Sequence, residues 1–345
     1  MARITLGIAS SHSPQVSTPA DQWHVHVDRD RESPYLDFDA LMAASTHDID
    51  DQLAIERMRE KDRACQDAIG ELARTLEEAA PDVLIVIGDD QRELFLDDGT
   101  PAFGIFYGDT IVDTSPDKQA MHPSIQLAYW SQHADAPESY PVDARFATHL
   151  IGTLVADAFD IAAYAKQPAG RSLGHAFTFV RRRLMTGRPI PIVPLFVNCF
   201  YPPNQPTAAR CFDLGRALRR AVMSFDADVR VGVIATGGLS HFVVDEAFDR
   251  SVLAALQKRD VAALKAIPPE RLVSGTSEIR NWLVLAGAVA ACESEIIEYV
   301  PAYRSTAKTG CGMAFMRWRE AAVPAARSSS SSNILASAPK QTHLA

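Results

Sequence analysis

The chain has 345 residues, 47% of them hydrophobic, and a formal net charge of −9. This length and composition suit a globular enzyme with one large α/β domain or two small ones. The acidity argues against a nucleic-acid-binding protein or a membrane-surface protein, both of which usually present a basic face. The only basic run, Arg181-Arg182-Arg183, is interpreted as a solvated helix face.

The cysteines and the first residues indicate the cellular compartment. Five cysteines occur without any CxxC pair, and this odd number favours buried thiols in a reducing compartment over a disulfide framework or a zinc knuckle. Met1-Ala2-Arg3 leads straight into a strand-like stretch without the long apolar region of a signal peptide. No apolar run reaches the length of a membrane helix. We therefore predict a cytoplasmic protein without a nucleic-acid or membrane partner.

The first quarter of the chain contains two predicted strands separated by an insertion and a helix. Residues 3–9 (RITLGIA) are predicted to form a buried strand, and residues 15–47 are polar, irregular and rich in Asp and His. The pattern turns helical at about 50–79, where one face carries Cys65, Ile69, Leu72 and Leu76. Residues 83–88 (VLIVIG) are predicted to form a strand buried on both faces. We interpret residues 15–75 as an insertion or lid.

The rest of the chain alternates strands with helices. Strands are predicted at 103–107, 159–164, 190–198, 230–236, 295–300 and 312–317. Helices are predicted at 144–157, 173–186, 206–224, 246–258 and 278–293. The alternation predicts an α/β fold with a mixed central sheet covered by helices on both faces. We expect one catalytic domain over 1–322 and a disordered tail over 323–345, which contains a run of serines.

Chemistry is expected in the loops that follow strands, because ligands of open α/β sheets bind at the carboxyl ends of the strands. Three such loops are unusual: SSHSP at 10–14, GDDQRE at 88–93 and TGGLSH at 236–241. The sequence has no P-loop, no GxGxxG after a strand, no GxSxG and no HExxH. What remains is a set of histidines and one carboxylate near strand and helix ends, namely His12, His175, His241 and Glu278.

Each of these four residues has a functional and a structural interpretation. His12 is a metal ligand at a strand end or a histidine hydrogen-bonded in its loop. His241 follows paired glycines and is a general base or part of a turn. His175 opens a helical stretch, where the helix dipole would depress its pKa and keep it neutral. Glu278 is a metal ligand or a favourable charge at a helix N-terminus. Together they suggest a non-haem metal site with two histidines and one carboxylate.

Six segments, in this order and at this spacing, carry a resemblance to a known family. They are MARITLGIASSHSP (1–14), PDVLIVIGDDQRELF (81–95), VNCFYPP (197–203), RCFDLG (210–215), TGGLSH (236–241) and SGTSEIRNWLVLAGA (274–288). They resemble the class III extradiol dioxygenases, in particular the catalytic (β) chains of the protocatechuate 4,5-dioxygenase type and their gallate and 3-O-methylgallate relatives. The resemblance runs from residue 1 to about 318. The insertion looks more like the gallate and methylgallate branch.

The resemblance implies an iron centre with one altered ligand. His12 matches the family's first iron-binding histidine, and Glu278, four residues before Trp282, matches its carboxylate ligand. The family's second iron-binding histidine follows an aspartate after the second strand, and the ungapped match over 81–95 puts Gln91 there. The implied Fe(II) ligands are therefore His12, Glu278 and Gln91. Nearby oxygen ligands or outer partners are Asp89, Asp90 and Glu93.

The resemblance also implies roles for the other residues. His241 matches the acid/base that acts on the substrate hydroxyl, and His175 matches a second histidine of the pocket. Lys308 and Thr309 align near the loop that binds the substrate carboxylate. The implied activity is extradiol cleavage of a catechol-type aromatic acid, in which both atoms of O2 enter the product.

Two other functions stay open at this point. Loss of a ligand histidine would also suit a hydrolase or lyase that uses zinc or another divalent ion, or a non-catalytic partner subunit that has lost iron. Retention of all four residue types argues against the last of these. The resemblance further implies a homo-oligomer. A small α-type subunit is a candidate partner, although no segment of this chain resembles it, and the insertion would replace it as a lid.

Overall fold

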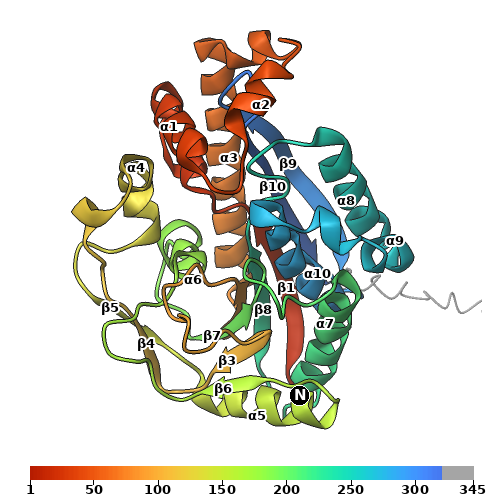
Figure 1. The fold of residues 1–345 in the computed structure, drawn as a ribbon. Helices are drawn as coiled ribbons and strands as arrows, with labels where there is room; N and C mark the ends of the chain where they lie inside the picture. Colours follow the sequence, from red (N-terminus) through yellow and green to blue (C-terminus); the bar gives the residue numbers. More distant parts are fainter. Residues whose placement is uncertain (321–345) are drawn as a thin grey trace, which may run out of the picture.

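A computed structural model describes residues 1–320, so the tail predicted at 323–345 lies outside the described residues. The centre is an eight-stranded sheet with the order β6-β3-β7-β2-β8-β1-β10-β9 (Figure 1). Its strands are β1 (Arg3–Ser10), β2 (Val83–Gly88), β3 (Phe103–Phe106), β6 (Ala162–Tyr164), β7 (Ile192–Val197), β8 (Arg230–Thr236), β9 (Glu293–Tyr303) and β10 (Gly310–Arg319). The strands β4 (Thr110–Asp113) and β5 (Glu138–Pro141) form a separate pair.

The central sheet is mixed, as the sequence predicts. The neighbours β7, β2, β8 and β1 are parallel, whereas β10 is antiparallel to both β1 and β9, and β3 is antiparallel to β7. Because β2, β8 and β1 are parallel neighbours, their carboxyl ends meet at one edge of the sheet. The loops SSHSP, GDDQRE and TGGLSH therefore start side by side at that edge.

Ten α-helices are described in residues 1–320. They are α1 (His24–Glu32), α2 (Phe38–Ala43), α3 (Ile55–Ala79), α4 (Pro123–Gln132), α5 (Ala144–Ala156), α6 (His175–Phe179), α7 (Ala208–Met223), α8 (Glu246–Lys258), α9 (Val261–Lys265) and α10 (Ile279–Ala288). The irregular structure expected at 15–47 is wrong in part, since α1 and α2 lie there. Helix α6 continues into one turn of π-helix at Val180–Leu184.

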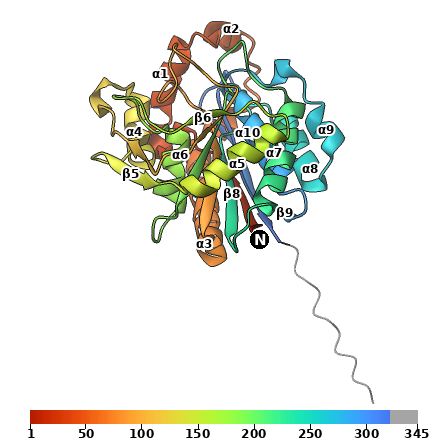
Figure 2. The ribbon, with the colours of Figure 1, turned by 90° about the horizontal axis from the view of Figure 1, so that it is seen from below.

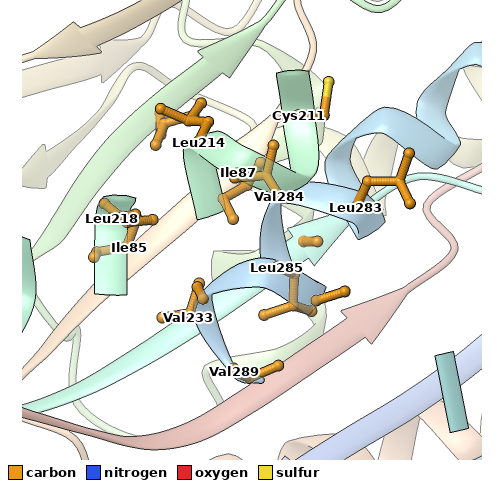
Figure 3. Close-up of a cluster of buried hydrophobic side chains, with 14 of the residues drawn as sticks. Ile85, Ile87, Cys211, Leu214, Leu218, Val233, Leu283, Val284, Leu285 and Val289 are labelled. Atoms are coloured by element: carbon orange, nitrogen blue, oxygen red, sulfur yellow. The ribbon is translucent and has the colours of Figure 1, made fainter. Parts of the chain in front are cut away.

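Strand β2 illustrates how helices come to cover both faces, which confirms the predicted fold class. Ile85 and Ile87 belong to one hydrophobic cluster with residues of α5, α7 and α10, whereas Leu84 and Val86 belong to a second cluster with residues of α3 and α6. This alternation follows from the two-residue period of a strand. Figure 3 shows part of the first cluster, and Figure 2 shows α3 on one side of the sheet with α5 and α7 on the other.

Helices α7 and α10 are in backbone contact at two glycines. A Cβ built on Gly215 would lie 1.9 Å from the carbonyl oxygen of Val284, and one built on Gly287 would lie 2.2 Å from that of Phe212. Backbone atoms cannot yield as the end of a flexible side chain can. Glycine at these positions therefore fixes how closely α10 approaches α7, and α10 begins directly after Glu278.

We expect Gly215→Ala to lower the free energy of unfolding by about 3 kcal/mol, at the upper end of the cost of overpacking, measured by urea denaturation. Gly152 is the matched control, because it lies in helix α5 and a Cβ built on it would meet no atom within 4 Å. Gly152→Ala should be neutral or stabilise the protein by about 0.5–1 kcal/mol. Equal effects of the two substitutions would contradict the close packing of α7 and α10.

Candidate active site

His12 lies directly after β1 and is the least satisfied polar side chain at this edge of the sheet. Its side chain is buried, with 1% of the residue exposed, and neither ring nitrogen has a hydrogen-bond partner within residues 1–320. The nearest carboxylate oxygen is Oε1 of Glu278, 3.6 Å from Nε2. Burying a polar group without a partner is costly, so an unpartnered imidazole that faces a carboxylate fits the role of a metal ligand.

Two buried carboxylates face His12. Asp89 follows β2 and Glu278 precedes α10, and one potential ligand atom from each of His12, Asp89 and Glu278 lies within 4.8 Å of the other two. Burial opposes the ionisation of Glu278, but His241 and His12 hold the pKa of this carboxyl well below its usual range. Burial and the nearby Glu278 raise the pKa of Asp89. This concentration of buried negative charge suits a cation.

Hydrogen bonds hold the two carboxylates in place. The backbone N–H of Gly238 donates to Oε2 of Glu278 at 2.7 Å. The side-chain amide of Asn281, one turn into α10, donates to Asp89 Oδ1 at 3.3 Å and to the carbonyl of Thr236 at 2.9 Å. Such outer partners orient the ligands of a metal site. Thus β2, β8 and α10 are joined at the candidate metal centre.

His241 contacts the same carboxylate from the loop after β8. Its Nδ1 lies 3.0 Å from the carbonyl oxygen of Leu239, and its Nε2 lies 3.4 Å from Oε2 of Glu278. A carbonyl only accepts, so Nδ1 carries a proton and Nε2 is the nitrogen free to exchange one. Burial opposes protonation of the ring, but Cys311 and Glu278 raise the pKa of His241 well above its ordinary value.

Comparison with known proteins places this arrangement in a family. Residues 53–315 match the family described as the catalytic LigB subunit of aromatic ring-opening dioxygenase. The chain belongs to this family. Over 199 residues it is 31% identical to a gallate dioxygenase of Pseudomonas putida, a match that covers 53% of this chain and 55% of that protein. The chain thus spans about half the length of the curated relative it matches. The resemblance inferred from the sequence is confirmed.

The cavity next to this LigB-type centre brings the sequence-predicted residues together. It has a volume of about 500 Å³, and its lining includes His12, Gln91, His175, His241 and Glu278. These residues span more than two thirds of the chain, and none of their side chains is fully exposed. Their placement in one cavity agrees with the predicted site, whereas their individual roles stay predictions.

His175 is paired more strongly than the sequence indicates. Its Nδ1 lies 2.6 Å from Oε1 of Glu93, and its ring packs edge-on against that of His12 with 4.9 Å between centroids. Burial lowers the pKa of His175, but Glu93 outweighs burial and raises the pKa to about 9. The expectation that the helix dipole depresses this pKa is therefore wrong: a partly buried carboxylate in contact is a stronger influence than the end of a five-residue helix.

Lys308 and Thr309 do not line the cavity. The ammonium of Lys308 pairs with Asp48 at 2.9 Å in a partly exposed position, and the hydroxyl of Thr309 is buried 2.7 Å from that of Ser305. The cationic residues that do line the cavity are Arg29 and Arg304, neither of which was predicted from the sequence. Arg29 lies in the segment predicted to be irregular, so the sequence gave no indication that a helix would place it at the cavity.

No helix within residues 1–320 combines the length and the hydropathy that a membrane span requires.

Proposed function

We propose that this member of the LigB family is a non-haem Fe(II)-dependent extradiol dioxygenase that cleaves the ring of a catechol-type aromatic acid with O2. The observation that carries the proposal is the buried imidazole of His12, which has no hydrogen-bond partner in the described part of the chain and faces two buried carboxylates. Family membership and the likeness to a gallate dioxygenase support the same reaction class.

The donor atoms fit a divalent metal ion. His12, Glu278 and Asp89 would hold it, and a bound Fe(II) would supply a template for substrate and O2 and a path for electrons between them. Asp89 would take the place of the imidazole that the family pattern puts at position 91. We therefore assign Asp89 as the third ligand and Gln91 as its partner, because the Gln91 amide nitrogen donates to Asp89 Oδ2 at 3.1 Å. The prediction that Gln91 itself is the ligand is the competing assignment.

The histidines of the cavity would handle protons. A cation bound to Glu278 would offset the negative charge that raises the pKa of His241. With Nδ1 held by Leu239, Nε2 of His241 would then accept the proton of a substrate hydroxyl and return it when the ring opens. Nδ1 of His175 donates its proton in a hydrogen bond to Glu93, so Nε2 of His175 is the second nitrogen that can exchange a proton with a substrate in the cavity. Both side chains are only partly exposed, at 16% for His175 and 11% for His241, which limits the access of bulk water to these transfers.

Metal analysis and oxygen uptake test the proposal together. We expect protein purified without added metal to bind about one Fe(II) per chain and to consume O2 with 3,4-dihydroxybenzoate or 3,4,5-trihydroxybenzoate. A hydrolase or lyase is the second candidate, because one imidazole and two carboxylates are harder donors than the usual triad and suit other divalent ions. Metal binding without oxygen uptake would favour it, and neither property would favour a non-catalytic partner subunit.

Position 91 distinguishes the two ligand assignments. If Gln91 only orients Asp89, Gln91→Ala should weaken Fe(II) binding by about 10–100-fold, the usual effect of losing an outer partner, and Gln91→His should not strengthen it. Fe(II) titration of both variants gives the answer, with circular dichroism as the check on folding. Tighter binding by Gln91→His would instead show that position 91 belongs to the coordination sphere. The cytoplasmic location and the homo-oligomer stay predictions.

A further inference from the structure

One wall of the cavity comes from helix α1, which belongs to the inserted segment. His26, Arg29 and Asp30 line the cavity, and their spacing of three and four residues puts them on one helix face. Figure 1 shows α1 beside α4, above the carboxyl end of β1. The segment after α1 adds Tyr35, which lies edge-on to Phe200 and stacks near Phe242, and both of these residues also line the cavity.

A buried ion pair fastens α1 to the turn between β9 and β10. The guanidinium of Arg304 donates to both oxygens of Asp30, at 2.7 and 2.5 Å, and to Oε1 of Gln15 at 2.7 Å. The side chains of Arg304 and Asp30 are 7% and 2% exposed. Arg304 therefore has its charge compensated and its donors occupied, so its pair with Asp30 holds the wall and offers little to a ligand.

Arg29 differs from Arg304 in having no such partner. Its guanidinium makes no ion pair or side-chain hydrogen bond with any residue in 1–320, and the neighbouring Asp30 is paired with Arg304. Glu32, the other acid of this wall, lies 3.8 Å from His122. Burial and the charges of Arg304 and Arg29 lower the pKa of His26 to about 2, so His26 is neutral. Arg29 is thus the uncompensated positive charge of this wall.

We propose that Arg29 binds the anionic substituent of the substrate, the carboxylate of an aromatic acid. This inference rests on the proposed function and gives its substrate a contact that the family resemblance did not supply. An arginine offers a carboxylate two parallel donors, and a cavity that also contains Tyr35, Phe200 and Phe242 suits an aromatic ring. Lys308, the residue expected in this role, already pairs with Asp48 and does not line the cavity.

The test compares two probes of nearly the same shape that differ in charge. 3,4-Dihydroxybenzoate and its neutral amide, 3,4-dihydroxybenzamide, are titrated without O2 into the metal-loaded protein by calorimetry. Arg29→Met should weaken benzoate binding by about 10-fold and leave amide binding unchanged. The expected loss is near the lower limit for a charge-assisted contact, because Arg29 is exposed to solvent. Arg29→Lys should restore part of the affinity. Added salt should weaken benzoate binding more in the wild type than in Arg29→Met.

Arg31→Met is the matched control, because Arg31 lies on the same helix, pairs with Asp28 at 3.3 Å and does not line the cavity. It should change neither titration. The inference is overturned if Arg29→Met weakens both probes equally or neither, if only Lys308→Met is selective for the benzoate, or if the wild type binds neither probe. If Arg29→Met loses affinity for the benzoate alone and the wild type consumes no O2, the role of Arg29 is supported and the dioxygenase proposal fails. If the wild type consumes O2 but Arg29→Met does not discriminate between the probes, the dioxygenase proposal is supported and the role of Arg29 fails.

Discussion

His241→Ala is expected to lower kcat for ring opening by about 10²–10⁴-fold, the usual contribution of a general acid–base group, with metal content unchanged. The reason is that Nδ1 of His241 is fixed by the Leu239 carbonyl, which leaves Nε2 as the atom that exchanges a proton with the substrate. Steady-state oxygen uptake gives kcat, and elemental analysis of the same sample gives the metal content.

The alternative to a proton-transfer role is a structural one, since Nε2 of His241 also lies 3.4 Å from Glu278. In that case metal content and kcat would fall in proportion. Added imidazole separates the two roles further, because in the vacated space it can replace a missing proton acceptor but is not tethered to the chain and so cannot hold Glu278 in place. An unchanged kcat in His241→Ala would remove this residue from the mechanism.

Glu278→Gln should lower Fe(II) affinity strongly, because a neutral amide replaces a charged ligand at the centre of the site. The loss should exceed that caused by removing an outer partner, which is typically about 10–100-fold. The substitution preserves shape, and the amide oxygen can still accept the Gly238 N–H. Equilibrium titration with Fe(II) under anaerobic conditions measures the change, and oxygen uptake should fall in parallel.

Asp89→Asn is the companion variant for this measurement. Asp89 accepts hydrogen bonds from Gln91 and Asn281, so an asparagine there loses the charge with little change in size. If Asp89 is the third ligand, both variants should bind Fe(II) weakly. Normal affinity in Asp89→Asn would leave only His12 and Glu278 as ligands of the proposed centre, and normal affinity in Glu278→Gln would contradict the metal site.

Much of the fold was predictable because it depends on local pattern. The run VLIVIG gave the bounds of β2 correctly, since an unbroken apolar run bounded by Pro81 and the polar GDDQRE loop indicates a strand buried on both faces. Helix α10 ends at Ala288, several residues before its predicted end at 293. The prediction ran too far because residues 289–292 are still apolar beyond the end of the helix. The apolar pattern alone therefore could not locate this boundary.

The parts of the site that escaped prediction depend on contacts between distant segments. Helix α1 is mostly polar, and one of the contacts that hold it is the pairing of Asp30 with Arg304, 274 residues away. The sequence of residues 24–32 contains no pattern that predicts this long-range contact. Similarly, the partner of Lys308 is Asp48, 260 residues away, which directs the ammonium away from the cavity. That His12 and Glu278 lie close together was predictable, because their loops resemble those of a family and the carboxyl ends of neighbouring parallel strands lie together.

The pairing of Asp30 with Arg304 has a consequence for how this enzyme could be altered. The candidate metal centre is built on the sheet and on α10, whereas one wall of the cavity is the short stretch at 26–35, which pairs through Asp30 with Arg304 in the turn between β9 and β10. If Arg29 binds the substrate carboxylate as proposed, the residues that hold the metal and a residue that selects the substrate lie in separate segments of the chain. A stretch from a related chain that kept an acid opposite Arg304 could be grafted here to change which molecules are admitted, leaving the reaction itself untouched.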